Sequence, residues 1–330
     1  MTEIALIACD HGFGHTKRCY IFGLELAKID NKVTIFARRD AIEKFSSIYG
    51  THENLTCSYL NTNTDPRKSF NQLIDWLNLL PDLSKYKLVV SDNLPEILYL
   101  RKDAILSGSF LWHLDSQFID DQYRVFCEDL LMAYRPKHIA SEFFVSVELS
   151  QRSQLIPIGL IGSQQSKKSF QSCFDGALLI SGGKSAAFRS EFNALVNNLV
   201  LCENPKFTKV YVDSWLMPNN PPAWMFEGDF SPEMYNSISV AIIRPGVGTV
   251  TDCMANDVFI ISMYESENKE MITNSKAIIS ANYGVEARYE ELDEHFLRFS
   301  IIEQYSNFKE KRMQPSFNGE RQFVKSIQNL

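Results

Sequence analysis

The sequence has 330 residues, a formal net charge of −7 at pH 7 and 45% hydrophobic residues. A chain of this length exceeds the size at which one hydrophobic core keeps growing, so we expect two domains. The acidic balance argues against a nucleic-acid-binding protein, because contacts to phosphates usually need a basic face. The seven cysteines form no CxxC pair, which argues against a zinc site or a disulfide framework.

The N-terminal apolar run over residues 4–9 is too short to span a membrane, and it has neither a basic leader nor a cleavage site. We therefore expect a cytoplasmic protein. Any contact with a membrane is expected to be peripheral, at its inner face.

Short apolar runs alternate with amphipathic segments of helical length along the first half of the chain. This alternation predicts parallel strands connected by helices, with ligands at the carboxyl ends of the strands. The expected strands cover residues 4–9, 32–37, 55–59, 88–91 and 103–107, and helices are expected to begin at His15, Ala41, Ser69 and Pro95.

A second series of the same kind starts at residue 176, so both halves are expected to be doubly wound α/β domains. Its strands are expected at 176–181, 209–213, 239–244 and 258–263, and its helices at 185–201, 248–255 and 269–281. The polar stretch 162–169 is the best linker candidate. We therefore place the domains at residues 1–162 and 163–330.

Each half contains a glycine-rich turn directly after an apolar run. The turns are Asp10–Arg18, with Gly12 and Gly14, and Arg244–Asp252, with Gly246 and Gly248. A glycine turn between a buried strand and a helix lets backbone amides face an anionic ligand. Two such turns suggest a ligand held between two similar domains.

The first turn carries a candidate general base. Gly14 has no Cβ atom to keep a substrate from the backbone, and His15 follows at the start of a helix. The near-neutral pKa of a histidine suits proton abstraction from a hydroxyl or a water. Asp92 ends an expected strand at the same edge of the sheet, where it could orient His15. The structural alternative is that both residues only cap helices.

The segment 109–113 follows the next expected strand and ends in Trp112 and His113. These two residues, together with His11, are expected to line an acceptor pocket. The alternative is that Trp112 belongs to the core and His11 packs within its loop.

The second turn carries a candidate nucleotide site. Gly246 and Gly248 permit close approach, Thr249 offers a hydroxyl and an amide, and the Asp252 carboxylate can accept two hydrogen bonds from a ribose diol. Asp252 could instead be a capping residue near the helix dipole. Further candidates for binding the same donor are Gly14, Ser181, Gly182, Gly183, Arg244, Asn268 and Glu270. The structural alternatives are that residues 181–183 form only a tight turn and that the residues before 270 form a solvated loop. The GxxxxGK[ST] spacing of a P-loop is absent, which argues against an ATPase.

Taken in order, these residues resemble nucleotide-sugar glycosyltransferases of the GT-B fold, especially the branch with the lipid II-forming N-acetylglucosaminyltransferase. The resemblance is strongest at residues 4–20 and 239–278. It implies two Rossmann-like domains facing a central cleft, with the last helix, about 319–330, crossing back to the first domain. It also implies that Gly246, Gly248, Thr249 and Asp252 bind the nucleotide diphosphate and ribose, and that sugar contacts fall near 268–270.

The first glycine turn is also similar to the UDP-sugar hydrolase of pseudaminic acid biosynthesis, in which the corresponding histidine activates water. Both resemblances imply that His15 removes a proton. They differ in the nucleophile, which is an acceptor hydroxyl in a transferase and water in a hydrolase.

Our leading hypothesis is an inverting glycosyltransferase that moves a sugar from a nucleotide sugar, such as a UDP-sugar, to a glycan, lipid-linked or small-molecule acceptor in cell-surface glycan biosynthesis. No Asp-x-Asp motif follows a suitable strand, so we expect neither a metal nor another cofactor. The alternatives are a nucleotide-sugar hydrolase and a non-catalytic nucleotide-sugar-binding protein.

Overall fold

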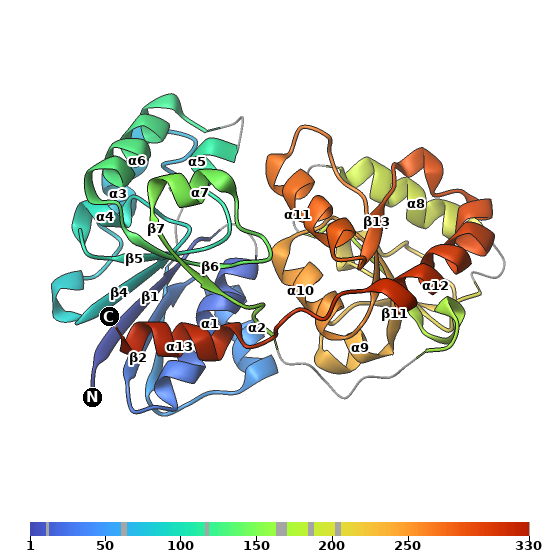
Figure 1. The fold of residues 1–330 in the computed structure, drawn as a ribbon, viewed down its shortest axis with the longest axis horizontal. Helices are drawn as coiled ribbons and strands as arrows, with labels where there is room; N and C mark the ends of the chain where they lie inside the picture. Colours follow the sequence, from blue (N-terminus) through green and yellow to red (C-terminus); the bar gives the residue numbers. More distant parts are fainter. Residues whose placement is uncertain are drawn as a thin grey trace. The chain divides into compact units, whose positions relative to one another are not determined.

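The computed structural model describes residues 1–10, 13–60, 65–115, 119–162, 170–183, 188–201 and 206–329. The chain divides into two compact units (Figure 1). Unit 1 comprises Met1–Ile161 and Asn318–Leu330, and unit 2 comprises Gly162–Phe317. Among the described residues, no helix has the length and apolar character needed to cross a membrane.

Unit 1 is built on a seven-stranded parallel sheet with the order β3-β2-β1-β4-β5-β6-β7. Its strands are β1 (Glu3–Ala8), β2 (Lys32–Ala37), β3 (Leu55–Tyr59), β4 (Leu88–Asp92), β5 (Ile105–Ser107), β6 (Lys137–Ser141) and β7 (Gln154–Ile158). The strand order reverses between β1 and β4. That reversal is the topological switch point at which doubly wound folds bind ligands.

Helices cover both faces of this sheet (Figure 1). They are α1 (Gly14–Ala27), α2 (Arg39–Tyr49), α3 (Leu73–Leu77), α4 (Ile97–Leu100), α5 (Trp112–Asp115), α6 (Asp121–Tyr134), α7 (Val147–Arg152) and α13 (Gly319–Gln328). Side chains alternate along a strand, so β1 serves two cores. Leu6 packs with residues of α1, α2 and α13, whereas Ile7 packs with residues of α3, α4 and α6.

The C-terminal helix α13 packs on unit 1 although it follows unit 2 in the sequence (Figure 1). Phe323 stacks on Phe22 of α1 with ring centroids 3.6 Å apart. The Gln322 side chain accepts a hydrogen bond from the backbone N–H of Gly159 at 2.5 Å. A Cβ atom at Gly319 would lie 2.3 Å from the Gly159 carbonyl oxygen, so this contact needs glycine.

Unit 2 contains a six-stranded parallel sheet with the order β10-β9-β8-β11-β12-β13. Its strands are β8 (Ala177–Ser181), β9 (Val210–Val212), β10 (Met225–Glu227), β11 (Ile238–Ile243), β12 (Phe259–Ser262) and β13 (Gly284–Glu286). Its α-helices are α8 (Arg189–Leu201), α9 (Pro232–Ser237), α10 (Val247–Ala255), α11 (Lys269–Ser280) and α12 (Ile301–Lys311). The central strands β8 and β11 are buried throughout. Both units are therefore Rossmann-like, as the alternation of strands and helices predicted.

Candidate functional site

His15 and Asp92 meet at the switch point of unit 1. His15 is the second residue of α1, and Asp92 is the last residue of β4, where it pairs in register with Ala8 of β1. The His15 Nδ1 atom lies 2.7 Å from Asp92 Oδ1. Asp92 is fully buried and His15 is 8% exposed. The fold thus joins two predicted site residues that are far apart in sequence.

Asp92 has two further partners. Arg18 donates from Nε to Oδ2 at 2.6 Å and from Nη2 to Oδ1 at 2.7 Å, and the Ser107 hydroxyl donates to Oδ2 at 2.8 Å. Burial by itself would raise the pKa of Asp92, but the Arg18 charge and hydrogen bonds, together with His15, outweigh burial and hold that pKa well below its usual range. Asp92 is therefore an ionised carboxylate.

Because Asp92 is ionised, it determines which of the two ring nitrogens carries the proton in neutral His15. A carboxylate only accepts hydrogen bonds, so the His15 Nδ1 atom carries the proton and donates a hydrogen bond to Asp92. Arg18 Nη2 lies 3.2 Å from the same Nδ1, but two donors cannot hydrogen-bond to each other, so that approach is a repulsive contact. Nε2 is left as the basic nitrogen of the ring, the arrangement that a carboxylate-oriented general base requires.

Trp112 lies beside His15, whereas His113 does not. The Trp112 and His15 ring centroids are 6.4 Å apart, and the Asn93 amide accepts from the indole Nε1 at 2.6 Å when its oxygen faces the ring. His113 is fully buried, with its Nε2 2.7 Å from Glu128 Oε1. This burial argues against the predicted contact of His113 with an acceptor. His11 and Gly12 lie outside the described residues.

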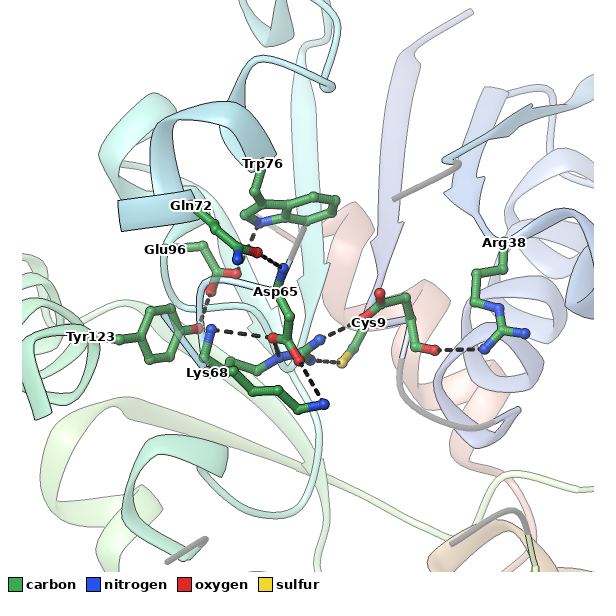
Figure 2. Close-up of polar contacts among 10 residues, drawn as sticks. Cys9, Arg38, Asp65, Lys68, Gln72, Trp76, Glu96 and Tyr123 are labelled. Carbon is green, nitrogen blue, oxygen red and sulfur yellow. Dashed lines mark hydrogen bonds and ion pairs between the residues drawn. The ribbon is translucent and has the colours of Figure 1, made fainter. Parts of the chain in front are cut away.

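A buried arginine holds the chain where it leaves β1 (Figure 2). Arg67 donates to Cys9 Sγ at 2.8 Å, to Asp10 Oδ1 at 2.6 Å and to Asp65 Oδ1 at 2.8 Å. Arg38 contributes a hydrogen bond to the Asp10 carbonyl oxygen at 3.3 Å. Asp10, the first residue of the first glycine turn, is therefore fixed by two arginines, which the sequence pattern did not predict.

The second glycine turn leads into α10 of unit 2. Gly246 is the N-cap residue, no side chain caps the helix, and residues 246–249 are half-buried. A Cβ atom at Gly246 would meet nothing within 4 Å. The buried Asn274 side chain, from α11, donates a hydrogen bond to the Pro245 carbonyl oxygen at 2.8 Å and so stabilises the turn. Gly246, Gly248 and Thr249 stand at this helix start, where backbone amides could face an anion; that they bind one stays a prediction. Asp252 lies one turn further along α10, half-buried.

Two other predicted donor contacts have protein partners. Arg244 forms a two-pronged ion pair with Glu265, with Nη2 2.6 Å from Oε1 and Nε 3.0 Å from Oε2. Asn268 is the N-cap residue of α11: its Oδ1 accepts from the Met271 amide, and its Nδ2 donates to Glu265. These contacts order the loop after β12. Glu270 follows in the first turn of α11 and is half-buried.

The turn 181–183 is bound by an acidic residue. The Ser181 hydroxyl donates to Asp213 Oδ1 at 2.9 Å, and the Gly183 amide donates to Asp213 Oδ2 at 3.0 Å. Gly182 is covered by Phe192 and Trp215, each 3.0 Å from the position that a Cβ atom would take. A phosphate here would have to compete with a carboxylate for both donors, so these contacts argue against the predicted anion contact at Ser181 and Gly183.

Within the described ranges, no group of three or more His, Cys, Asp or Glu residues is arranged to hold a metal ion. The carboxylates Asp120 and Asp121 stand at the start of α6, where Asp120 caps the helix through the amides of residues 122 and 123.

The two Rossmann-like units in sequence define the GT-B fold, and the similarity to this fold that the glycine turns predicted is confirmed. Spinosyn forosaminyltransferase SpnP superposes with a TM-score of 0.67 at 12% identity, covering 99% of this chain and 98% of that chain. UGT89C1 of Arabidopsis thaliana in complex with UDP gives 0.67 at 11% identity, with coverage of 99% and 98%. The calicheamicin glycosyltransferase CalG4 gives 0.62 at 12% identity, with coverage of 100% and 98%. No family model and no curated protein matches the sequence.

Proposed function

We propose that the protein is an inverting, metal-independent glycosyltransferase in which His15 is the general base. The observation that carries the proposal is the pairing of His15 Nδ1 with the buried, ionised Asp92 at the switch point of unit 1. The GT-B fold supports the same reading, because the solved structures with this fold named above are glycosyltransferases.

In the proposed reaction, His15 Nε2 takes the proton of an acceptor hydroxyl as that oxygen attacks the anomeric carbon of the donor. The new carbon–oxygen bond forms while the bond from the anomeric carbon to the diphosphate oxygen breaks, and the nucleoside diphosphate leaves with the electron pair. Attack from the face opposite the leaving group inverts the anomeric centre. Burial, together with the charges of Arg18 and Arg67, lowers the pKa of His15 against the raising effect of Asp92, so the base is neutral at pH 7.

We assign donor binding to unit 2. The amides at the start of α10 would receive the diphosphate, and Asp252 would bond the ribose hydroxyls. Two solved neighbours carry the same nucleotide: UGT89C1 was solved with UDP and with UDP-L-rhamnose, and Os79 from O. sativa with UDP. UGT89C1 was also solved with quercetin. These complexes support a UDP-sugar donor and a small-molecule acceptor for this chain.

Thermal unfolding in the presence of nucleotides tests the donor site. A ligand at about 100 times its dissociation constant adds ~2.7 kcal/mol to the folded state. We expect stabilisation by UDP and by a UDP-sugar, and a much smaller effect in Asp252→Ala. Absence of a shift with any nucleotide diphosphate would remove the support for an enzyme of this class.

Transfer and hydrolysis differ in their dependence on an acceptor. A transferase releases nucleoside diphosphate quickly only when an acceptor hydroxyl is supplied. Release of free sugar at an undiminished rate without acceptor would replace transfer by hydrolysis, with His15 activating water.

A further inference from the structure

Arg18 is placed to act on His15 through a shared carboxylate. His15 and Arg18 are three residues apart in α1, so their side chains lie on one face of the helix. The Arg18 guanidinium holds both oxygens of Asp92, and its Nη2 is also 3.2 Å from His15 Nδ1. The Arg18 side chain is 12% exposed, so water screens these charges little.

We propose that Arg18 is a positioning residue that shares Asp92 with His15 and so weakens the stabilisation of the protonated His15 ring by that carboxylate. A lone His–Asp pair becomes an ion pair when the histidine is protonated, which favours the protonated state. Here the Asp92 charge is already balanced by Arg18. Protonated His15 would therefore stand beside a second cation and would release its proton readily.

This inference rests on the proposed role of His15 as the base. It assigns to Arg18 the task of keeping His15 unprotonated at neutral pH, and thus of extending activity toward lower pH. Arg18 need not touch either substrate for this purpose. Its geometric signature is the two-pronged contact with Asp92, a geometry that a lysine ammonium cannot reproduce.

Within the described part of the chain, the other charged and titratable groups that act on His15 or Asp92 do not replace Arg18. Arg67, from the loop after β3, acts on His15 in the same direction as Arg18 but has no direct contact with Asp92. His138 of β6 has its Nε2 2.9 Å from the Gly108 carbonyl oxygen, and burial lowers its pKa to about 4. Ser107 contributes a neutral hydroxyl to Asp92.

Unit 1 provides a matched control at a second His–carboxylate–Arg group. Glu128 contacts His113 Nε2 at 2.7 Å and accepts from Arg152 Nε at 2.8 Å. An Arg152→Gln variant removes an arginine of the same kind from the same unit without touching Asp92. It reports the effect of losing one positive charge elsewhere in the unit.

The test is an NMR titration of His15 in the full-length protein, with the resonance assigned by its loss in His15→Gln. We expect Arg18→Gln to raise the His15 pKa by about one unit or more, Arg18→Lys to raise it less, and Arg152→Gln to leave it unchanged. With donor and acceptor supplied, the acid limb of the transfer rate should move upward by the same amount in Arg18→Gln.

An unchanged or lowered His15 pKa in folded Arg18→Gln would overturn the inference. If that variant does not fold, Arg18→Met decides in the same way, because it also removes the positive charge beside Asp92. The titration needs no turnover, so it separates the two claims. Transfer that survives His15→Gln would refute the proposed function, whereas a fixed pKa with a required His15 would refute only the role of Arg18.

Discussion

Asp213 is a buried carboxylate that accepts hydrogen bonds from the turn 181–183. It is 6% exposed, and within the described part of the chain no Lys, Arg or His forms an ion pair with it. Burial raises its pKa to about 6, against the hydrogen bonds from Ser181 and Gly183, which lower it. The folded protein therefore binds this proton more tightly than the unfolded chain does.

The raised pKa of Asp213 predicts a pH-dependent contribution to stability. The contribution of protonated Asp213 is fully present below its ordinary pKa of 3.8 and is lost as the pH rises through about 6. Asp213→Asn cannot ionise, so its free energy of unfolding should improve relative to wild type across that range. Denaturant unfolding at a series of pH values measures the difference. Parallel curves for the two proteins would contradict the prediction.

Some site residues could be predicted from the sequence, and others could not. His15 and Asp92 were predictable because both follow buried apolar runs, whose carboxyl ends share one edge of the sheet. The His15–Arg18 spacing is a usable signal for Arg18, since a three-residue separation places both side chains on one helix face. The bond from Ser181 to Asp213 had no local signal. It depends on β8 and β9 being neighbours in the sheet, which the sequence does not specify.

Within the elements of unit 2, we expect alanine at two glycine positions to have opposite effects on stability. Gly246 has open space beside it and an ordinary φ of −69°, so Gly246→Ala should keep the free energy of unfolding within about 0.5 kcal/mol of wild type. Its methyl group would occupy the approach to the amides of α10. We expect nucleoside diphosphate binding to weaken by ~1.5–3 kcal/mol, the value of a hydrogen bond to a charged group.

Gly284 of β13 is the contrasting position. A Cβ atom there would lie 1.9 Å from the Ile260 carbonyl oxygen, so Gly284→Ala must displace backbone and should cost about 1–3 kcal/mol of stability. Thermal unfolding and nucleotide titration of both variants check the pair. Unimpaired nucleotide binding by Gly246→Ala would argue against an anion at the start of α10.

Most strands were predicted closely, whereas β6, β7, β10 and β13 were not predicted. The ranges 32–37 and 55–59 coincide with β2 and β3. Two of the unpredicted strands, β10 and β13, have only three residues each, and β7 is a half-exposed edge strand that contains Pro157. A hydrophobic run is the signal for a strand, and these segments have little of it to show.

For the molecule as a whole, the last helix stabilises the first unit. Phe323 is fully buried against Phe22, so Phe323→Ala should cost ~3–5 kcal/mol, and the loss should fall on unit 1. Hydrogen exchange resolved by peptide measures where protection is lost. Phe299→Ala, at a 58% exposed position of unit 2, is the control and should change stability by no more than about 0.5 kcal/mol. Equal loss of protection in both units would contradict the assignment of α13 to unit 1.

The central claim is that a His15-dependent glycosyl transfer takes place on this fold. The most direct test is the rate of sugar transfer from a UDP-sugar to a panel of hydroxyl acceptors, for wild type and His15→Gln side by side. We predict transfer with inversion by the wild type and a loss of ~10²–10⁴-fold in His15→Gln, with UDP-sugar affinity unchanged. Equal rates for the two proteins, or no turnover by wild type that binds the donor, would contradict it.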